Sequence, residues 1–134
     1  MFSSIYQKYI FTIKPYILGF ICRMLFSRKN IIINKGFLCD SIPRIIVDKN
    51  ANLLIQKNVY FRKDVEVRAH KTSKITIYKS VKLDRGVRLL ATNKSRMSIG
   101  SHTAIGLHSV FNGGDDITIG KSCLISGFVY IQTS

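Results

Sequence analysis

The chain has 134 residues, enough for one domain with a modest core, and 46% of them are apolar, which excludes a disordered protein. Lysine and arginine number 21 against 7 acidic residues, so the formal net charge is +14. Such an excess suits a nucleic acid, an anionic membrane surface or a phosphorylated ligand as partner.

Residues 1–30 are expected to form a separate, amphipathic helical segment. Apolar and aromatic residues dominate 5–26 and recur at helical spacing near one face, while Pro15 predicts either one kinked helix or two short helices. The longest uncharged stretch, 15–22, is short for a membrane span, because the apolar run is interrupted by Lys8, Lys14 and Arg23. Three interpretations stay open: a cap packed on the following domain, a peripheral anchor on the anionic inner face of a membrane, and a true span.

From residue 53 onward an apolar residue returns every six positions, in units that begin at residues 53, 75, 97 and 117. A period of six predicts coils with three short straight sides, each side pointing one side chain inward onto its equivalent in the next coil. The twelve inward positions are Ile55, Phe61, Val67, Ile77, Leu83, Leu89, Ile99, Ile105, Phe111, Ile119, Ile125 and Ile131.

Residues 31–52 fit this register poorly and are expected to form a first, imperfect coil, because terminal repeats cap the column. Polar, turn-prone residues at 71–74, 93–96 and 113–116 are expected to bulge from one corner as loops. A β-sandwich would need longer alternating strands joined by hairpin turns, which the sequence lacks. We therefore predict one all-β solenoid, a parallel β-helix of hexapeptide repeats, over residues 31–134.

Three segments, 99–104, 105–110 and 119–124, begin with Ile-Gly and match the hexapeptide-repeat pattern closely. Over roughly residues 31–134 the chain resembles the left-handed β-helix acyltransferases of the sugar O-acetyltransferase group. The stretch 111–120, leading into 129–134, is similar to the segment before the active centre of that family. The resemblance implies a left-handed coil and a homotrimer, with acetyl-CoA and a sugar or glycolipid acceptor meeting in clefts between subunits.

The implied activity is O-acetylation of a sugar hydroxyl in the biosynthesis of capsule, lipopolysaccharide or another surface polysaccharide, in the cytoplasm or at the inner membrane face. The family uses a His as general base, placed shortly after the stretch similar to 131–134. No catalytic residue is therefore expected within the chain, which we interpret as the inactive front portion of such an enzyme. Asn112 is the one polar residue carried over, as a contact to the acceptor; alternatively it is a corner residue with positive φ.

The remaining polar residues point to no chemistry of their own. His102 and His108 are expected at solvated corners and His70 at the start of a polar loop, while Asp115 and Asp116 are expected to shape a bend. The cysteines Cys22, Cys39 and Cys123 are odd in number and suit neither a zinc site nor a disulfide framework, so we expect reduced thiols and no metal.

Basic residues recur on successive coils, which keeps a second class of function open: a non-catalytic β-helix scaffold or a module that binds through its basic surface. No motif for sequence-specific nucleic-acid binding is present, so we expect no specific nucleic acid as partner. The sequence assigns no residue to acetyl-CoA.

Overall fold

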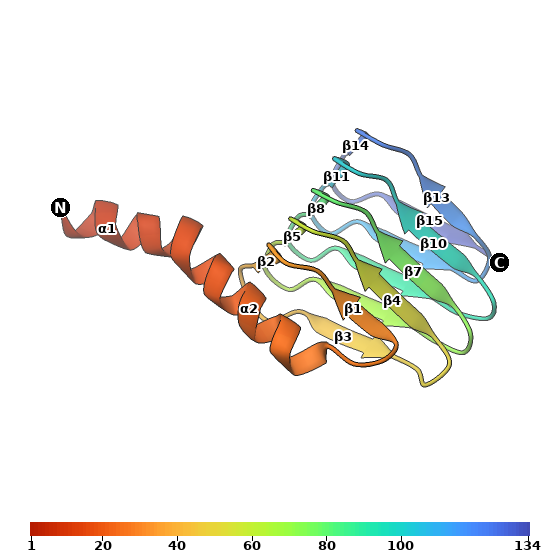
Figure 1. The fold of residues 1–134 in the computed structure, drawn as a ribbon. Coiled ribbons are helices and arrows are strands. Elements are labelled where there is room, and N and C mark those ends of the chain that lie inside the picture. The colour runs from red at the N-terminus through yellow and green to blue at the C-terminus, as the bar shows by residue number, and fades with distance from the viewer.

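The structure is a computed structural model that describes residues 1–134, a helix followed by a β-solenoid (Figure 1). The chain visits three parallel five-stranded sheets in turn. The first sheet contains β1 (Ile31–Ile33), β4 (Asn52–Ile55), β7 (Lys74–Ile77), β10 (Arg96–Ile99) and β13 (Ile117–Ile119). The second contains β2 (Leu38–Cys39), β5 (Tyr60–Phe61), β8 (Lys82–Leu83), β11 (Ala104–Ile105) and β14 (Leu124–Ile125). The third contains β3 (Arg44–Val47), β6 (Glu66–Ala69), β9 (Arg88–Ala91), β12 (Val110–Gly113) and β15 (Tyr130–Thr133).

The predicted parallel β-helix is confirmed, and so is its register. Ile55 pairs with Ile77 in the first sheet, and Phe61 pairs with Leu83 in the second. The first residue of each predicted unit pairs with the first residue of the next one, in the order 53, 75, 97 and 117. Nine of the twelve inward positions are buried, and the three in the last coil are half-buried against the same core. The handedness of the coil stays a prediction.

The first coil is more regular than its sequence suggested. Ile33, Cys39 and Ile45 lie six residues apart and pair with the inward positions of the next coil. All three side chains are buried. The register was obscured because a cysteine occupies a position that is aliphatic or aromatic in every later coil.

The expected loops at 71–74, 93–96 and 113–116 are wrong, because the structure has tight corners there. Lys71 has a φ of 58° and opens a two-residue turn, and Lys74 already belongs to β7. Ser73 between them is fully buried, and its hydroxyl lies 2.7 Å from the His70 carbonyl oxygen and 3.2 Å from that of Ala91. The residues by which these coils exceed three hexapeptides lie in the straight sides, because β4 and β6 have four residues each whereas β5 has two.

The N-terminal segment is one continuous helix built from α1 (Phe2–Lys8), the π-helical η1 (Tyr9–Ile13) and α2 (Lys14–Phe26). The two-helix alternative is therefore wrong. Pro15 lacks an N–H and would clash with a carbonyl in the preceding turn of a regular α-helix, and the wider π-helical turns lie directly before it. By length and composition alone, the helix Phe2–Phe26 is able to cross a membrane.

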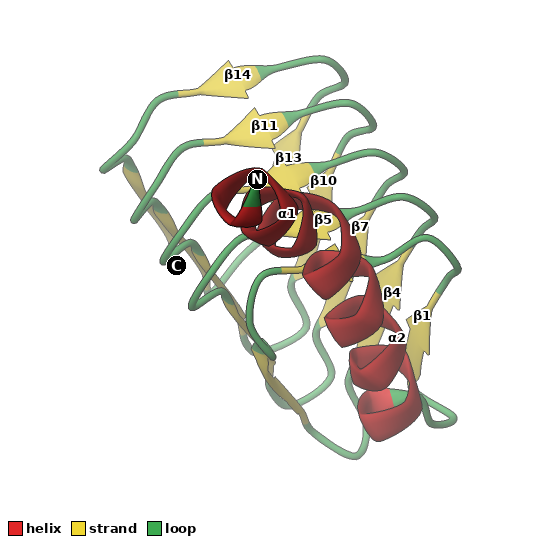
Figure 2. Cartoon of the chain, turned by 90° about the vertical axis from the view of Figure 1, so that its left-hand side faces the viewer, coloured by secondary structure: helices red, strands yellow, loops and turns green.

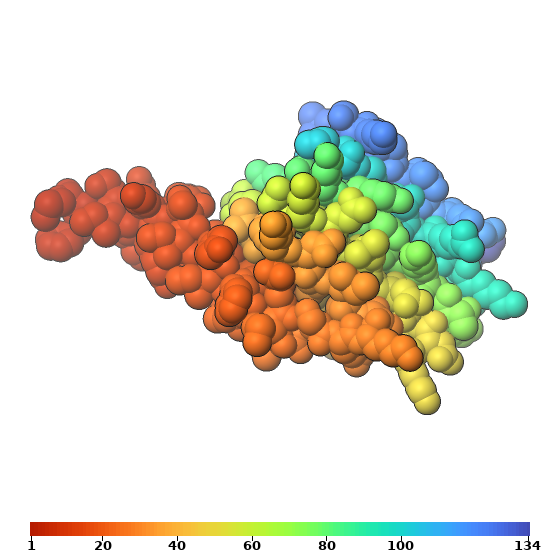
Figure 3. All heavy atoms as spheres, in the orientation of Figure 1, coloured from red at the N-terminus to blue at the C-terminus, as the bar shows by residue number.

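The two halves of the helix have different surroundings. α2 packs against β2 and covers the open end of the first coil, where Pro15, Gly19 and Cys22 are buried. Leu18 and Phe26 also pack on the core, so α2 is the predicted cap. α1 and η1 project from the solenoid as a rod (Figure 3), and Figure 2 views the molecule from this end, with the helix in front of the stacked coils.

Candidate functional site

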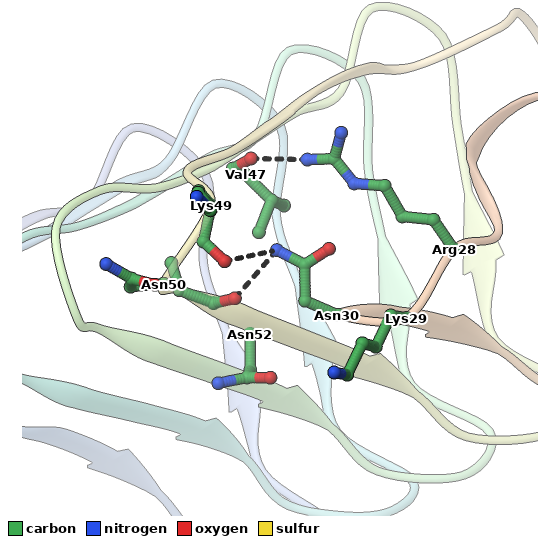
Figure 4. Close-up of a pocket in the computed structure, with 8 residues that line it drawn as sticks. Arg28, Lys29, Asn30, Val47, Lys49, Asn50 and Asn52 are labelled. Carbon is green, nitrogen blue, oxygen red and sulfur yellow. Dashed lines mark hydrogen bonds between the residues drawn. The ribbon is translucent and has the colours of Figure 1, made fainter.

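A cavity of about 650 Å³ lies where the linker after α2 meets the corner between β3 and β4 (Figure 4). The Asn30 side-chain amide donates to the carbonyl oxygens of Asp48 and Ala51, at 2.9 Å each, and Arg28 donates to the carbonyl of Val47. These side chains hold the linker against the first coil. No histidine or carboxylate side chain lines the cavity, so it offers no imidazole or carboxylate as general base.

A second cavity, of about 480 Å³, contains a group of cations that we call the lysine corner, namely Arg23, Lys35, Lys57 and Lys79. The three lysines occupy the same corner of successive coils, because each coil there takes 22 residues. Backbone bonds fix this stack: the Asn58 N–H lies 3.2 Å from the Lys35 carbonyl oxygen, and the Ser80 N–H lies 3.1 Å from that of Lys57. No acidic residue lines the cavity, so the lysine corner suits a phosphate or another anion.

The next corner, on the other side of β2, forms a third cavity of about 360 Å³ beside η1. Here the Arg62 Nε lies 2.6 Å from an Asp40 oxygen, and the Tyr60 hydroxyl donates to the other oxygen at 2.5 Å. Burial and this bond to Asp40 raise the pKa of Tyr60 to about 12, and the bond from Arg62 to Asp40 raises the pKa of Arg62. Asp40 is thus committed to its neighbours and is poorly placed to act as a base.

The same cavity contains three further cations, Lys14, Lys63 and Arg85, which we call the second basic corner. Asp84 also lines the cavity, and one of its oxygens accepts the Arg85 backbone N–H at 2.7 Å. The two basic corners therefore border β2, one before it and one after it, and α2 packs on the same strand.

His102 and His108 lie at exposed corners as predicted, with φ of 61° and 55°. The His108 ring is stacked near Phe128 at 5.5 Å between ring centres, and no carboxylate pairs with either imidazole. Both are solvated corner residues.

His70 has a partner that sequence reasoning missed. Its Nδ1 lies 3.3 Å from an Asp48 oxygen, and the other Asp48 oxygen accepts the Lys71 backbone N–H at 2.7 Å. The N–H of Lys71, and then His70, lower the pKa of Asp48. The sequence does contain a signal for this pair. Asp48 and His70 are 22 residues apart, which is one full coil, and this separation places them side by side at one corner. His70 follows β6 directly and lies at a tight corner, not in a loop.

Asn112 lies inside β12, between Leu90 and Gln132 of the neighbouring coils. The alternative of a corner residue with positive φ is therefore wrong. Its side chain is half-buried on the outer face of the third sheet and makes no hydrogen bond within the chain, so it is free to contact a ligand. Asp115 and Asp116 shape the bend after β12, where Asp116 accepts the Arg96 backbone N–H at 2.7 Å.

The cysteines show no arrangement for metal binding or catalysis. Cys22 of α2 and Cys39 of β2 are both fully buried, and their mutual contact and burial raise the pKa of Cys22. All three thiols are free, and no group of three or more His, Cys, Asp and Glu side chains converges on one point.

In comparisons with known proteins, no family model, no curated protein and no solved structure matches this chain.

Proposed function

We propose that this chain provides the β-helix of an acyl-CoA-dependent O-acetyltransferase that acts on a sugar hydroxyl during the assembly of capsule, lipopolysaccharide or another surface polysaccharide. The supporting observation is the Ile-Gly hexapeptide register of the later coils. At Gly100 an added Cβ would lie 2.4 Å from the Gly120 carbonyl carbon, so position 100 leaves no room for a side chain between these two coils. This close stacking gives the resemblance a physical basis in the fold.

The proposed reaction needs a base that removes the proton of the acceptor hydroxyl while the oxygen attacks the thioester carbonyl of acetyl-CoA and the CoA thiolate leaves. His102 and His108 lie at exposed corners, and none of the three histidines of the chain lies at the position that the resemblance implies for the base. The proposal therefore places the general base outside residues 1–134. Asn112, half-buried and unbonded on the third sheet, is proposed to contact the acceptor.

The partners of the proposed enzyme are acetyl-CoA, a sugar or glycolipid acceptor and two further copies of the chain in a homotrimer. The formal charge of +14 favours encounter with acetyl-CoA, whose phosphates are anionic. The proposed location is the cytoplasm, at the inner membrane face. No metal takes part in the proposed chemistry.

The test compares two proteins for transfer of radiolabelled acetyl from acetyl-CoA to sugar acceptors. One is residues 1–134, and the other is the product of the coding DNA read past the codon for Ser134. We expect no transfer by residues 1–134 and transfer by the longer product, which should contain a His within a few residues of Ser134. Transfer by residues 1–134 alone, or downstream bases that encode neither hexapeptides nor this His, would contradict the proposal.

A second candidate function is a non-catalytic β-helix that binds anions through its basic surface. The lysine corner favours it, because three stacked lysines and Arg23 line one cavity with no acidic residue among them. Calorimetric titration distinguishes the two functions. Saturable binding of acetyl-CoA that desulfo-CoA reproduces and inorganic phosphate does not favours the enzyme, whereas equal competition by any polyanion favours the binding module.

A further inference from the structure

The solvent-facing side of α2 is entirely apolar. We define its outer face as Tyr16, Ile17, Phe20, Ile21, Met24 and Leu25, whose exposed fractions run from 40% to 71%. The buried side instead contains Pro15, Gly19 and Cys22. A helix on the surface of a soluble domain normally presents polar residues to water, so an exposed face without them is unusual. The apolar surface continues along the projecting rod through Phe2, Ile5, Tyr6, Tyr9, Phe11 and Ile13.

The contact between α2 and the first coil limits how the helix can meet a membrane. A spanning helix needs lipid around its whole circumference over a hydrocarbon core about 30 Å thick. In α2, Pro15, Gly19 and Cys22 face protein, and Ile10 and Phe11 of η1 line the third cavity, so the free part of the helix is at most residues 1–13. At 1.5 Å of rise per residue this free part is about 20 Å long, which is too short to span. The docked helix therefore suits the interface of one leaflet.

The charges near the outer face identify its partner. The lysine corner and the second basic corner border β2, on which α2 lies. Neighbouring coils are about 4.8 Å apart, so Lys35, Lys57 and Lys79 lie within about 10 Å of one another along the solenoid, which is about one Debye length at an ionic strength of about 0.1 M. A second copy packed on this face would bring like charges together. An anionic surface would neutralise them.

We propose that the outer face of α2, continued by η1, lies in the interfacial region of an anionic phospholipid bilayer, with both basic corners against the headgroup phosphates. The helix enters one leaflet and does not span the bilayer, and the solenoid stays in water. The tyrosines at 6, 9 and 16 suit this depth, because their rings are apolar and their hydroxyls reach the headgroups. This docking is independent of the acetyltransferase proposal.

The first experiment measures the depth of the outer face. The chain contains no tryptophan, so Phe20→Trp introduces a single reporter, and Leu124→Trp in the last coil is the control. With vesicles of phosphatidylglycerol and phosphatidylcholine, we expect the emission of the Phe20→Trp variant to shift to the blue and to be quenched by lipids brominated on the upper acyl chain. The control should not respond. The proposal would be overturned if the emission maximum of the Phe20→Trp variant did not change on addition of vesicles. It would also be overturned if this maximum shifted with protein concentration in the absence of vesicles.

The second experiment measures the contribution of charge by vesicle sedimentation of the full chain. The triple variant K35Q/K57Q/K79Q alters the lysine corner, and K49Q/K71Q/K94Q removes the same charge from three exposed lysines at a different corner. Since each basic residue near an anionic surface contributes about fivefold, we expect the first variant to partition on the order of 100-fold more weakly. The second variant should lose clearly less. Equal losses would contradict a specific role of the lysine corner.

Alkaline carbonate extraction separates interfacial binding from spanning. We expect membranes carrying the wild-type chain to release it, as is usual for a protein held at the interface. Retention in the pellet would mean that α2 leaves the solenoid and spans the bilayer, which would overturn the proposed depth.

Discussion

Gly19 of α2 packs directly on the backbone of Phe37, so that a Cβ at position 19 would lie 1.8 Å from the Phe37 carbonyl oxygen. The atom it would meet is main chain, which has little freedom to move away. The helix and the first coil are therefore in contact through a position that tolerates no side chain. This contact holds the outer face in a fixed orientation relative to the basic corners.

Gly19→Ala should displace α2 from the first coil. Although alanine favours a helix over glycine, overpacking of this kind costs typically 1–3 kcal/mol, and we expect the free energy of unfolding to fall by about that amount. Urea unfolding followed by circular dichroism measures it. Ile21→Ala on the outer face is the control and should change stability by less than about 0.5 kcal/mol. A G19A variant as stable as the wild type would show that the helix is not docked in solution.

The inward column predicts a sharp contrast between two leucines of the second sheet. Leu83 is 0% exposed and Leu124 is 85% exposed. Leu83→Ala leaves a cavity between coils and should lower the free energy of unfolding by about 2–5 kcal/mol. Leu124→Ala should change it by less than about 0.5 kcal/mol. Thermal unfolding of the two variants, measured side by side, checks the register, since a shift of one residue would exchange the two results.

The six-residue period was enough to predict the core from the sequence, because one apolar side chain per side must stack in every coil. The contact between Asp48 and His70 was missed because only the apolar residues were aligned from coil to coil. Aligning the polar residues at the same spacing of 22 residues predicts this contact. The corner at 71–74 was mistaken for a loop because its serine is polar, although Ser73 is buried and bonded to two carbonyls. For Asn112, identity alone could not distinguish a corner from an outward strand position.

The orientation of α2 could not be predicted from the sequence, for a different reason. Apolar residues occupy both sides of residues 15–26, so periodicity alone did not decide which side is buried. The small residue Gly19 decides it, since only there can the helix approach the Phe37 backbone. The bulkier side chains, Phe20 and Met24 among them, are then left facing outward.

Thr103 connects two coils through its side chain, in a position where earlier coils have Val59 and Val81. Its hydroxyl donates to the Gly120 carbonyl at 2.7 Å and accepts the Cys123 N–H at 3.1 Å. Thr103→Val keeps the shape but leaves both backbone groups without this partner, so we expect a loss of about 1–3 kcal/mol. The matched control is Thr118→Val on an exposed position of β13. Unfolding in urea should separate the two, and equal stabilities would mean that water replaces the lost bonds.

Tyr60 predicts a dependence of stability on alkaline pH. Burial, and then the bond to Asp40, raise its pKa to about 12 from an ordinary value of 10.0. The unfolded chain therefore loses this proton before the folded chain does, and the contribution of Tyr60 to stability is present below pH 10 and declines between pH 10 and 12. Because the ring is partly exposed, solvent screening keeps the effect small.

The measurement is the free energy of unfolding as a function of pH for wild type, Tyr60→Phe and Tyr78→Phe. Tyr60→Phe should be less stable than wild type at neutral pH, since Asp40 loses a donor, and the difference should shrink as the pH rises toward 12. Tyr78→Phe removes a hydroxyl that makes no hydrogen bond within the chain, and it serves as the matched control. A gap between Tyr60→Phe and wild type that stays constant across this range would mean that the Tyr60 hydroxyl titrates alike in both states. The contact between Tyr60 and Asp40 would then stabilise the folded chain equally with the Tyr60 hydroxyl protonated or ionised.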